Sequence, residues 1–366
     1  MKKKNILIFV PMIGNGGVEK NLFIIANYLS KHFEKISIIS TSREFRFKFN
    51  KNINFITPKN KFWNKVKNRR LKILVCLYLL AKELLLKNNL NVLSFQGNLY
   101  CCLLCKIFKV KIVLRSNASI TGWSKGYFKK ILYYSISKMA DKIIVNSLEF
   151  QKEYKKYFDL KTIFIYNPLN KNEIIKNAKK KIKFSFYEKK TLNFINIGRL
   201  VDQKNQLLIL KSFKLIAEKT NYKFKLLIIG SGKNKKILSD FINLNNLRSS
   251  IKLINFQKNP FPYLNEADAF ILASKFEGLP NVLLEALTLK KLVISSDCPT
   301  GPKEILDYGK GGLIFKMNNK FDLYKKIIFF IKNKSKCEIL VNHGHDRLTR
   351  FDYYKNLEKY LKIVDF

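Results

Sequence analysis

Short, mostly apolar segments of strand length alternate with longer segments of helical length along almost the whole chain. The predicted strands lie in the first half at 5–10, 36–40, 91–95, 111–114, 142–145 and 162–165, and in the second half at 194–197, 225–229, 251–254, 269–273 and 292–295. Strands that are apolar on both sides are typical of parallel sheets covered by helices on both faces. The alternation therefore predicts an α/β fold built on parallel sheets.

The length of the chain predicts two domains. A chain of 366 residues is longer than a single hydrophobic core comfortably supports. Segment 171–190 is rich in lysine and poor in strand or helix signals, so we predict that it links a domain at 1–170 to a domain at 191–348. A final helix is predicted within 349–366.

The segment from Phe276 to Ala286 is the most informative one for function. Glu277 and Gly278 follow the apolar run 269–273, which places them in a loop at the carboxyl end of a predicted strand. Pro280 suits a helix start, so Glu285 lies inside the following helix. The N–H groups of a helix N-terminus favour an anion. Two carboxylates around such a helix end predict a pocket for a phosphorylated, hydroxyl-rich ligand, for example a nucleotide sugar.

The spacing of Glu277 and Glu285 resembles the Glu-x7-Glu motif of retaining glycosyltransferases with the GT-B fold, in particular family 4. Other matches follow in the order expected for that family. They are a glycine loop at 14–20, a segment at 196–205 that begins Asn-Ile-Gly-Arg-Leu, and a strand with a glycine turn at 226–232. Together these segments resemble the members that build bacterial surface polysaccharides.

The resemblance implies an α/β GT-B architecture, in which two Rossmann-like domains face each other across a cleft. Domain 1–170 is then the acceptor side and domain 191–348 binds the nucleotide sugar, while helix 349–366 crosses back to the first domain. The implied catalytic residues are Arg199, Lys204 and Glu277. Two fixed cations can stabilise the charge that develops on a departing nucleoside diphosphate, and Glu277 would contact the donor sugar.

The resemblance also implies a set of donor-binding residues. Gly16 and Gly17 match the loop that faces the donor diphosphate, and the backbone N–H groups of Asn281 and Val282 would meet the distal phosphate. Glu285 would accept hydrogen bonds from the ribose hydroxyls. No Asp-x-Asp pair is present, so we expect a metal-independent enzyme with neither a metal site nor a cofactor.

The chain departs from the family where many members carry a first-domain histidine close to the sugar. The three histidines are not suitably placed, and the matching region, 113–119, contains Arg115 and Asn117 instead. We predict an acceptor-side or donor-side role for these two residues. A strand end followed by a turn is the plain structural alternative.

The formal net charge of +44 at a pI of about 10.0 is extreme. Residues 1–190 hold 40 Lys and Arg against 10 Asp and Glu, and residues 191–366 hold 30 against 16. Compositional drift explains part of the charge, and attraction to an anionic surface is the functional alternative. The basic, aromatic stretches 61–70 and 123–130 suit docking on anionic lipid.

The resemblance implies a retaining hexosyltransferase that uses a UDP-linked sugar, either galactose or an N-acetylhexosamine. The partners would be a lipid-linked glycan acceptor and an anionic membrane surface, with no nucleic acid. No secretory signal or spanning segment is visible, so we expect a cytoplasmic protein at the inner face of the plasma membrane.

Three alternatives remain open at this point. A nucleotide-sugar epimerase can share the fold, but it needs first-domain acid and base residues that are scarce here. A basic nucleic-acid-binding protein is suggested by charge alone, because no recognised nucleic-acid motif is present. A silent sugar-nucleotide-binding partner of another transferase is the third, and the intact set of Arg199, Lys204, Glu277 and Glu285 argues against it.

Overall fold

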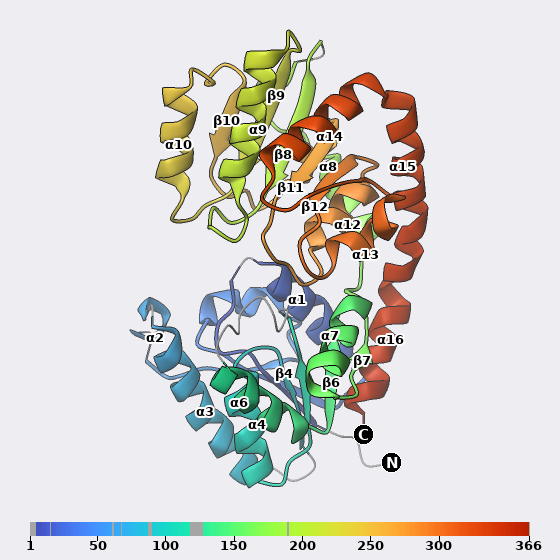
Figure 1. Ribbon diagram of the computed structural model, residues 1–366. Helices are drawn as coiled ribbons and strands as arrows, with labels where there is room; N and C mark the ends of the chain where they lie inside the picture. The colour runs from blue at the N-terminus through green and yellow to red at the C-terminus, as the bar shows by residue number, and fades with distance from the viewer. Residues whose placement is uncertain are drawn as a thin grey trace. The chain divides into compact units, whose positions relative to one another are not determined.

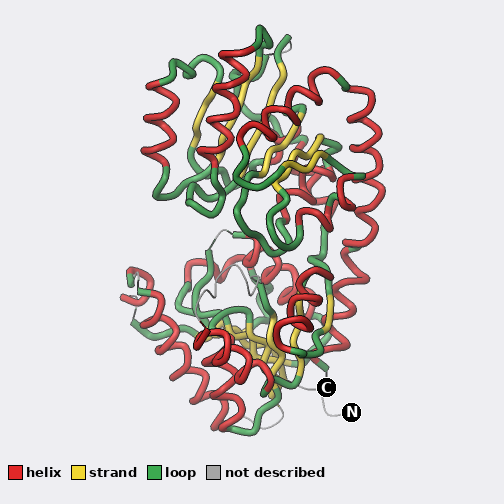
Figure 2. The backbone as a smooth tube through the Cα atoms, viewed as in Figure 1, coloured by secondary structure: helices red, strands yellow, loops and turns green. Residues whose placement is uncertain are grey.

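A computed structural model describes residues 5–14, 16–60, 62–66, 68–86, 90–117, 127–188 and 190–365. The chain divides into two compact units. The first contains Met1–Pro168 and Phe351–Phe366, and the second contains Leu169–Arg350. In each unit a parallel sheet lies among helices (Figures 1 and 2), which confirms the predicted α/β fold with two parallel-sheet domains.

The sheet of the first unit has the strand order β3-β2-β1-β4-β5-β6-β7. Its strand pairings among the described residues are parallel, and β1 pairs with both β2 and β4. Its strands are β1 (Asn5–Phe9), β2 (Lys35–Ile39), β3 (Asn54–Ile56), β4 (Leu90–Ser94), β5 (Ile112–Arg115), β6 (Lys142–Val145) and β7 (Ile163–Phe164).

Helices cover both faces of this sheet. Ile6 and Ile8 of β1 pack into one core with α1 and α16, whereas Leu7 and Phe9 pack into another with α3, α4 and α7. Side chains of neighbouring residues in a strand point to opposite faces of the sheet, so alternate residues of β1 pack into the two cores. The helices are α1 (Gly17–Leu29), η1 (Arg43–Lys48), α2 (Phe62–Lys65), α3 (Arg69–Leu86), α4 (Asn98–Ile107), α6 (Tyr127–Lys138), α7 (Leu148–Phe158) and α16 (Tyr353–Val364).

The second unit repeats this plan with the strand order β10-β9-β8-β11-β12-β13. Its strands are β8 (Leu192–Ile197), β9 (Phe224–Ile229), β10 (Ile251–Ile254), β11 (Ala269–Leu272), β12 (Leu292–Ser296) and β13 (Leu313–Phe315). Its helices are α8 (Lys171–Ala178), α9 (Gln206–Lys219), α10 (Lys235–Leu244), α11 (Phe261–Glu266), α12 (Asn281–Thr288), α13 (Pro302–Ile305), η2 (Asp307–Gly309), α14 (Lys320–Lys332) and α15 (Lys334–Asp346), and η3 (Arg347–Phe351) leads on to α16.

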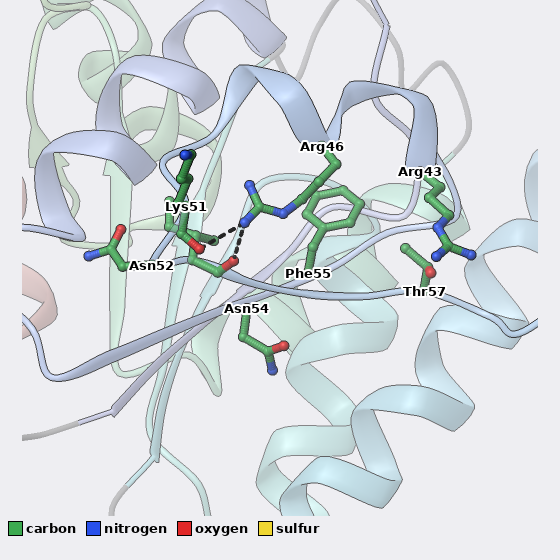
Figure 3. Close-up of a pocket in the computed structure, with 8 residues that line it drawn as sticks. Arg43, Arg46, Lys51, Asn52, Asn54, Phe55 and Thr57 are labelled. Atoms are coloured by element: carbon green, nitrogen blue, oxygen red, sulfur yellow. Dashed lines mark hydrogen bonds between the residues drawn. The ribbon is translucent and has the colours of Figure 1, made fainter.

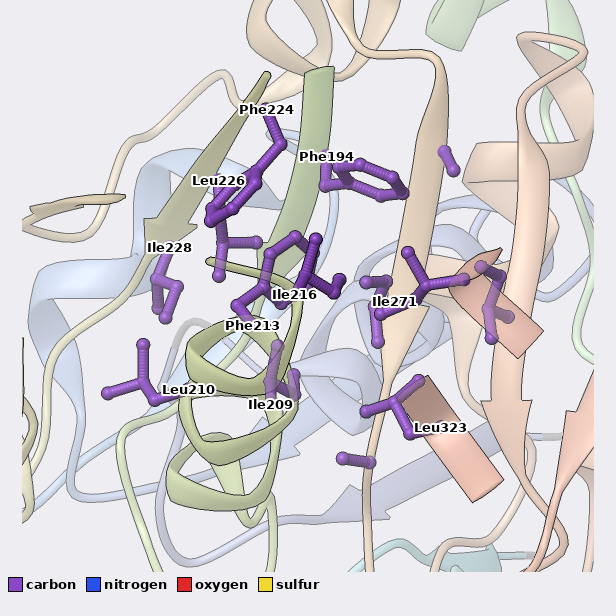
Figure 4. Close-up of a cluster of buried hydrophobic side chains, with 14 of the residues drawn as sticks. Phe194, Ile209, Leu210, Phe213, Ile216, Phe224, Leu226, Ile228, Ile271 and Leu323 are labelled. Atoms are coloured by element: carbon purple, nitrogen blue, oxygen red, sulfur yellow. The ribbon is translucent and has the colours of Figure 1, made fainter. Parts of the chain in front are cut away.

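One core of the second unit lies between α9 and the sheet. Ile209, Phe213 and Ile216 of α9 are fully buried against Phe194 of β8 and Ile271 of β11 (Figure 4). The rings of Phe194 and Phe213 meet edge to face, with centroids 5.1 Å apart. This packing fixes α9, and with it the loop that joins β8 to α9.

The segment predicted as a linker is partly a helix of the second unit. Residues 171–178 form α8, which packs against α11 and α12. The side chain of Asn170 caps the helix by accepting a hydrogen bond from the N–H of Glu173. Ile174 and Ala178 lie one turn apart and are buried. Because its other positions are at least partly exposed and, apart from Ile175, polar, the helix has the composition of a linker.

No helix in the described part of the chain is both long and apolar enough to cross a membrane. Two edge strands, β3 and β13, were not predicted from the sequence. Each is only three residues long, which is too short for its pattern to stand out from the neighbouring loops.

Candidate active site

Three loops meet at the carboxyl edge of the second sheet. They follow β8, β11 and β12, which are neighbouring strands. The strand order reverses between β8 and β11, because the chain runs outward to β10 in one direction and to β13 in the other. Ligands of open α/β sheets bind at such a switch point, beside the carboxyl ends of the strands. The predicted residues Arg199, Lys204 and Glu277 all lie on these loops.

Lys204 and Glu277 form an ion pair across this edge. Lys204 Nζ donates to Glu277 Oε1 at 2.5 Å, and the side chains are only 13% and 8% exposed. A charge-assisted contact of this kind is a strong one, and with little solvent around it each charge depends on its partner. The structure therefore brings two of the three predicted catalytic residues into direct contact, although 73 positions separate them.

Gln203 connects the same two loops through the backbone. Its side-chain amide donates to the carbonyl of Phe276 at 2.9 Å, while its own carbonyl accepts from the N–H of Lys275 at 2.8 Å. Its side-chain oxygen accepts from Arg199 Nη2 at 3.3 Å. Gln203 lies within the predicted segment 196–205, but no role was predicted for it from the sequence. The signal was its place directly before Lys204.

The loop after β12 holds the Glu277 loop from the other side. Thr300 Oγ1 donates to the carbonyl of Glu277 at 2.5 Å, and the N–H of Glu277 lies 3.4 Å from the carbonyl of Pro299. Thr300 is buried. The backbone of Glu277 is thus fixed by two contacts that do not use its carboxylate, and the carboxylate itself pairs with Lys204.

Three of the predicted donor-binding residues lie on α12. The helix begins at Asn281, directly after the Glu277 loop, so Asn281 and Val282 form its first turn. Glu285 follows one turn later and is buried. The helix N-terminus thus points its partial positive charge toward the loop that carries Glu277.

Arg199 has a more open position than Lys204. It follows β8 and is exposed. The side-chain amide of Gln206 donates to the carbonyl of Arg199 at 3.0 Å, which fixes its backbone. Its guanidinium is therefore available to an anion at the edge of the sheet.

Cys298 lies close to the ion pair but is no candidate nucleophile. Burial, with a smaller contribution from the negative charge of Glu277, raises the pKa of the Cys298 thiol to about 12. The thiol is therefore protonated at neutral pH, and the thiolate is the reactive form.

In the first unit, the predicted glycine loop holds a carboxylate of the chain itself. Gly16 precedes α1, which begins at Gly17. A Cβ added to Gly16 would come within 2.6 Å of Glu19 Oε2, so this carboxylate lies against the loop at the start of the helix. Gln96 Nε2 contacts its other oxygen at 3.4 Å. The role of Gly16 and Gly17 toward a donor phosphate stays a prediction.

Arg115 lies at the end of β5 with its side chain enclosed in the first unit. Its side chain is 1% exposed, Nε donates to Tyr360 Oη at 2.9 Å, and Nη2 donates to Asn167 Oδ1 at 2.9 Å. Its guanidinium also lies over the ring of Phe95, 5.2 Å from the centroid. Arg115 thus joins β5 to the final helix, and its acceptor-side or donor-side role stays a prediction. The half-buried Asn117 donates to the carbonyl of Phe95 at 2.8 Å, and its predicted role is untested.

A basic concavity of about 500 Å³ lies in the first unit between η1 and β3 (Figure 3). Arg43, Arg46 and Lys51 contribute its charge. Arg46 is held by the backbone: Nη1 donates to the carbonyls of Phe49 and Asn50, and Nη2 to those of Lys51 and Ile53, at 3.0 to 3.1 Å. Arg46 thereby closes the loop that leads into β3.

We expect Arg46→Ala to destabilise the protein by about 3 kcal/mol, because four carbonyls lose a charged donor. Arg43→Ala is the matched control, since its guanidinium makes no hydrogen bond or ion pair within the described part of the chain. Urea unfolding measures both changes. Equal stability of the two variants would show that the four contacts contribute nothing.

No cluster of three or more His, Cys, Asp or Glu side chains in the described residues could hold a metal ion. Separately, the carboxyl edge of the second sheet carries the carboxylate of Glu277, the cations of Lys204 and Arg199, and the N-terminus of α12. Residues 123–126 of the second basic, aromatic stretch fall outside the described part of the chain, as do the side chains of 127–130.

Comparison with known proteins shows that the chain is similar to glycosyltransferases. The family model described as glycosyl transferases group 1 matches residues 177–347. An uncharacterised glycosyltransferase of Methanocaldococcus jannaschii is 34% identical over 287 residues, which cover 70% of each chain. A Campylobacter jejuni enzyme, the N-acetylgalactosamine-N,N'-diacetylbacillosaminyl-diphospho-undecaprenol 4-alpha-N-acetylgalactosaminyltransferase, is 25% identical over 372 residues and 98% of each chain.

The fold also matches solved glycosyltransferases of the GT-B type. The crystal structure of Anabaena HepE in complex with UDP superposes with a TM-score of 0.77, at 14% identity and with 99% of each chain covered. At that identity the likeness concerns the fold. It agrees with the two parallel-sheet units described above.

Proposed function

Because the chain belongs to the glycosyl transferases group 1, we propose that it transfers a hexose from a UDP-linked donor to a lipid-linked glycan. The donor sugar in this proposal is galactose or an N-acetylhexosamine, and the product is part of a cell-surface polysaccharide. The name of the Campylobacter relative supports both the N-acetylhexosamine and the diphospho-lipid acceptor. UDP in the HepE complex supports the choice of nucleotide.

The observation that carries the proposal is the buried ion pair of Lys204 and Glu277 at the switch point of the second sheet. A donor diphosphate placed at the start of α12 would meet Lys204 and the exposed Arg199. Their positive charges stabilise the departing nucleoside diphosphate, whose charge grows in the transition state. Glu285, one turn into α12, would accept hydrogen bonds from the ribose hydroxyls.

The proposed reaction retains the configuration at the anomeric carbon. The acceptor hydroxyl attacks that carbon from the face that the diphosphate leaves, the bond to the diphosphate breaks, and a phosphate oxygen takes the hydroxyl proton. No side chain is then needed as a base, and Glu277 stabilises the positive charge on the sugar ring. Lys204 and Arg199 replace a divalent metal in this scheme.

A panel of UDP-, GDP-, ADP- and TDP-sugars tests the donor, with EDTA present throughout. We expect one UDP-sugar to raise the melting temperature and to be hydrolysed slowly without an acceptor. A ligand at a hundred times its Kd stabilises the folded state by about 2.7 kcal/mol, so the shift is measurable. The panel is run again with Mg²⁺ to test metal independence.

The proposal fails if no nucleotide sugar shifts the melting temperature. A melting-temperature shift that appears only with Mg²⁺ contradicts the metal-free scheme, but it is still consistent with a glycosyltransferase. Product analysis by NMR of the new anomeric proton decides between retention and inversion.

We place the proposed reaction at the inner face of the plasma membrane, where the enzyme would reach a lipid-linked acceptor.

A further inference from the structure

Three neighbouring helices of the first unit are apolar on the side that faces away from the sheet. They are α3, α4 and α6, which pack α3 to α4 and α4 to α6 (Figure 1). About half of the exposed large hydrophobic side chains of the described residues lie on these helices or directly beside them. We call this surface the helical face. It is formed by Leu71, Leu74, Tyr78, Leu85, Tyr100, Leu103, Ile107, Ile131 and Leu132.

The helical face is a second apolar stripe, distinct from the one that packs on the sheet. On α3, Cys76 and Leu80 are fully buried, whereas Leu74 is 60% and Tyr78 is 69% exposed. The exposed positions 71, 74, 78 and 85 recur at helical spacing, and so do 100, 103 and 107 on α4. A helix that is apolar on both sides needs a second apolar environment.

The surroundings of the helical face are strongly basic. Residues 61–140 contain 16 Lys and Arg and one acidic residue, Glu83. Arg69, Arg70 and Lys82 are exposed on α3, and Lys109 is exposed directly after α4. Cations around an exposed apolar patch complement a surface that is anionic outside and apolar below.

We propose that the helical face docks on the surface of an anionic lipid bilayer, with its apolar side chains among the acyl chains and its cations at the headgroups. The purpose of this docking, to reach a lipid-linked acceptor, rests on the proposed function. The docking itself does not. A second copy of the chain fits less well, because pairing the same face would bring two strongly basic surfaces together.

Vesicle binding by the full chain tests this surface. The protein is sedimented with vesicles of phosphatidylcholine and with vesicles of equimolar phosphatidylcholine and phosphatidylglycerol. We expect binding to the anionic vesicles that weakens as salt is raised. The variant Leu74→Ser/Tyr78→Ser/Leu103→Ser is expected to bind them at least about tenfold more weakly, because three apolar side chains no longer enter the lipid.

The matched control carries the same change on the second unit, Ile237→Ser/Phe321→Ser/Ile339→Ser. Those three side chains are 55%, 53% and 68% exposed, and they lie on α10, α14 and α15. The control is expected to bind anionic vesicles as the wild type does. All of the substituted residues are exposed, so both variants should fold, and circular dichroism melts check this.

The possible results of these measurements test the membrane-docking proposal separately from the proposed glycosyltransferase function. Loss of vesicle binding in the helical-face variant alone, with an unchanged melting shift on adding UDP, supports the proposal. No vesicle binding by the wild type, or equal binding by both variants, overturns it. So does concentration-dependent self-association that only the helical-face variant loses. Vesicle binding without any response to nucleotide sugars would refute the proposed function and leave the docking surface intact.

Discussion

Replacing Glu277 or Lys204 is expected to lower the rate of sugar transfer by a factor on the order of 10² to 10³, while the overall fold is kept. In the proposed reaction, each side chain supplies a charge to the reacting centre from a site with little solvent. Lys204 is 13% exposed and Glu277 is 8% exposed, so water screens neither charge well. Single-turnover transfer from the UDP-sugar found in the donor panel measures the effect.

The ion pair also contributes to stability, and the two effects must be separated. Lys204→Ala leaves the Glu277 carboxylate buried without its cation, which costs about 3 kcal/mol or more. The double variant Lys204→Ala/Glu277→Ala removes both charges and is expected to recover part of that stability. It is not expected to recover any transfer. Recovery of both would show that the pair is structural only.

Lys275→Ala is the control for loss of a cation near the site. Lys275 is exposed and lies on the same loop, two residues before Glu277. We expect this variant to change transfer less than about threefold, because an exposed charge is screened by water. Wild-type transfer by Lys204→Ala or Glu277→Gln would overturn the assignment of the site.

Gly301→Ala is expected to destabilise the protein by at least about 3 kcal/mol and to reduce transfer as well. Gly301 has a φ of 84°, in the region that favours glycine. A Cβ at this position would lie 1.8 Å from the carbonyl oxygen of Gly278. Since Gly278 follows Glu277 directly, relief of the clash must displace the catalytic loop.

Gly309→Ala provides a matched control for the backbone strain. Gly309 has a φ of 100°, but a Cβ there would meet only Ile314 Cδ1, at 3.8 Å. The Gly309→Ala variant therefore has the strain of an alanine at positive φ, without a Cβ clash against the backbone. Thermal melts and transfer rates of the two variants give the comparison. If Gly301→Ala behaves as Gly309→Ala does, the close approach of the two loops is not required.

The helices and strands near the site were predictable because their signals are local. The apolar run before Glu277 predicted β11, and the residues after Gly278 predicted α12. The final helix was likewise visible from its own pattern. Helix α8 was missed because only Ile174 and Ala178 are buried, and two buried positions do not form a periodic pattern.

Arg115 shows why a motif position does not determine a role. The sequence places it at the end of a strand, where substrate contact is plausible. Its partners Asn167 and Tyr360 lie 52 and 245 positions away, so only the folded chain shows that the guanidinium is enclosed. Burial of a polar side chain depends on what packs over it, and that is not a local property.

The sequence by itself determined the α/β class, the order of the motifs and the strand ends that carry Arg199, Lys204 and Glu277. These follow from apolar runs and from the residues directly after them. Only the tertiary structure decided that Lys204 pairs with Glu277, that Gln203 joins their loops, and that α3 has an exposed apolar side. Contacts between distant segments depend on how strands align in a sheet, and no local pattern records that alignment.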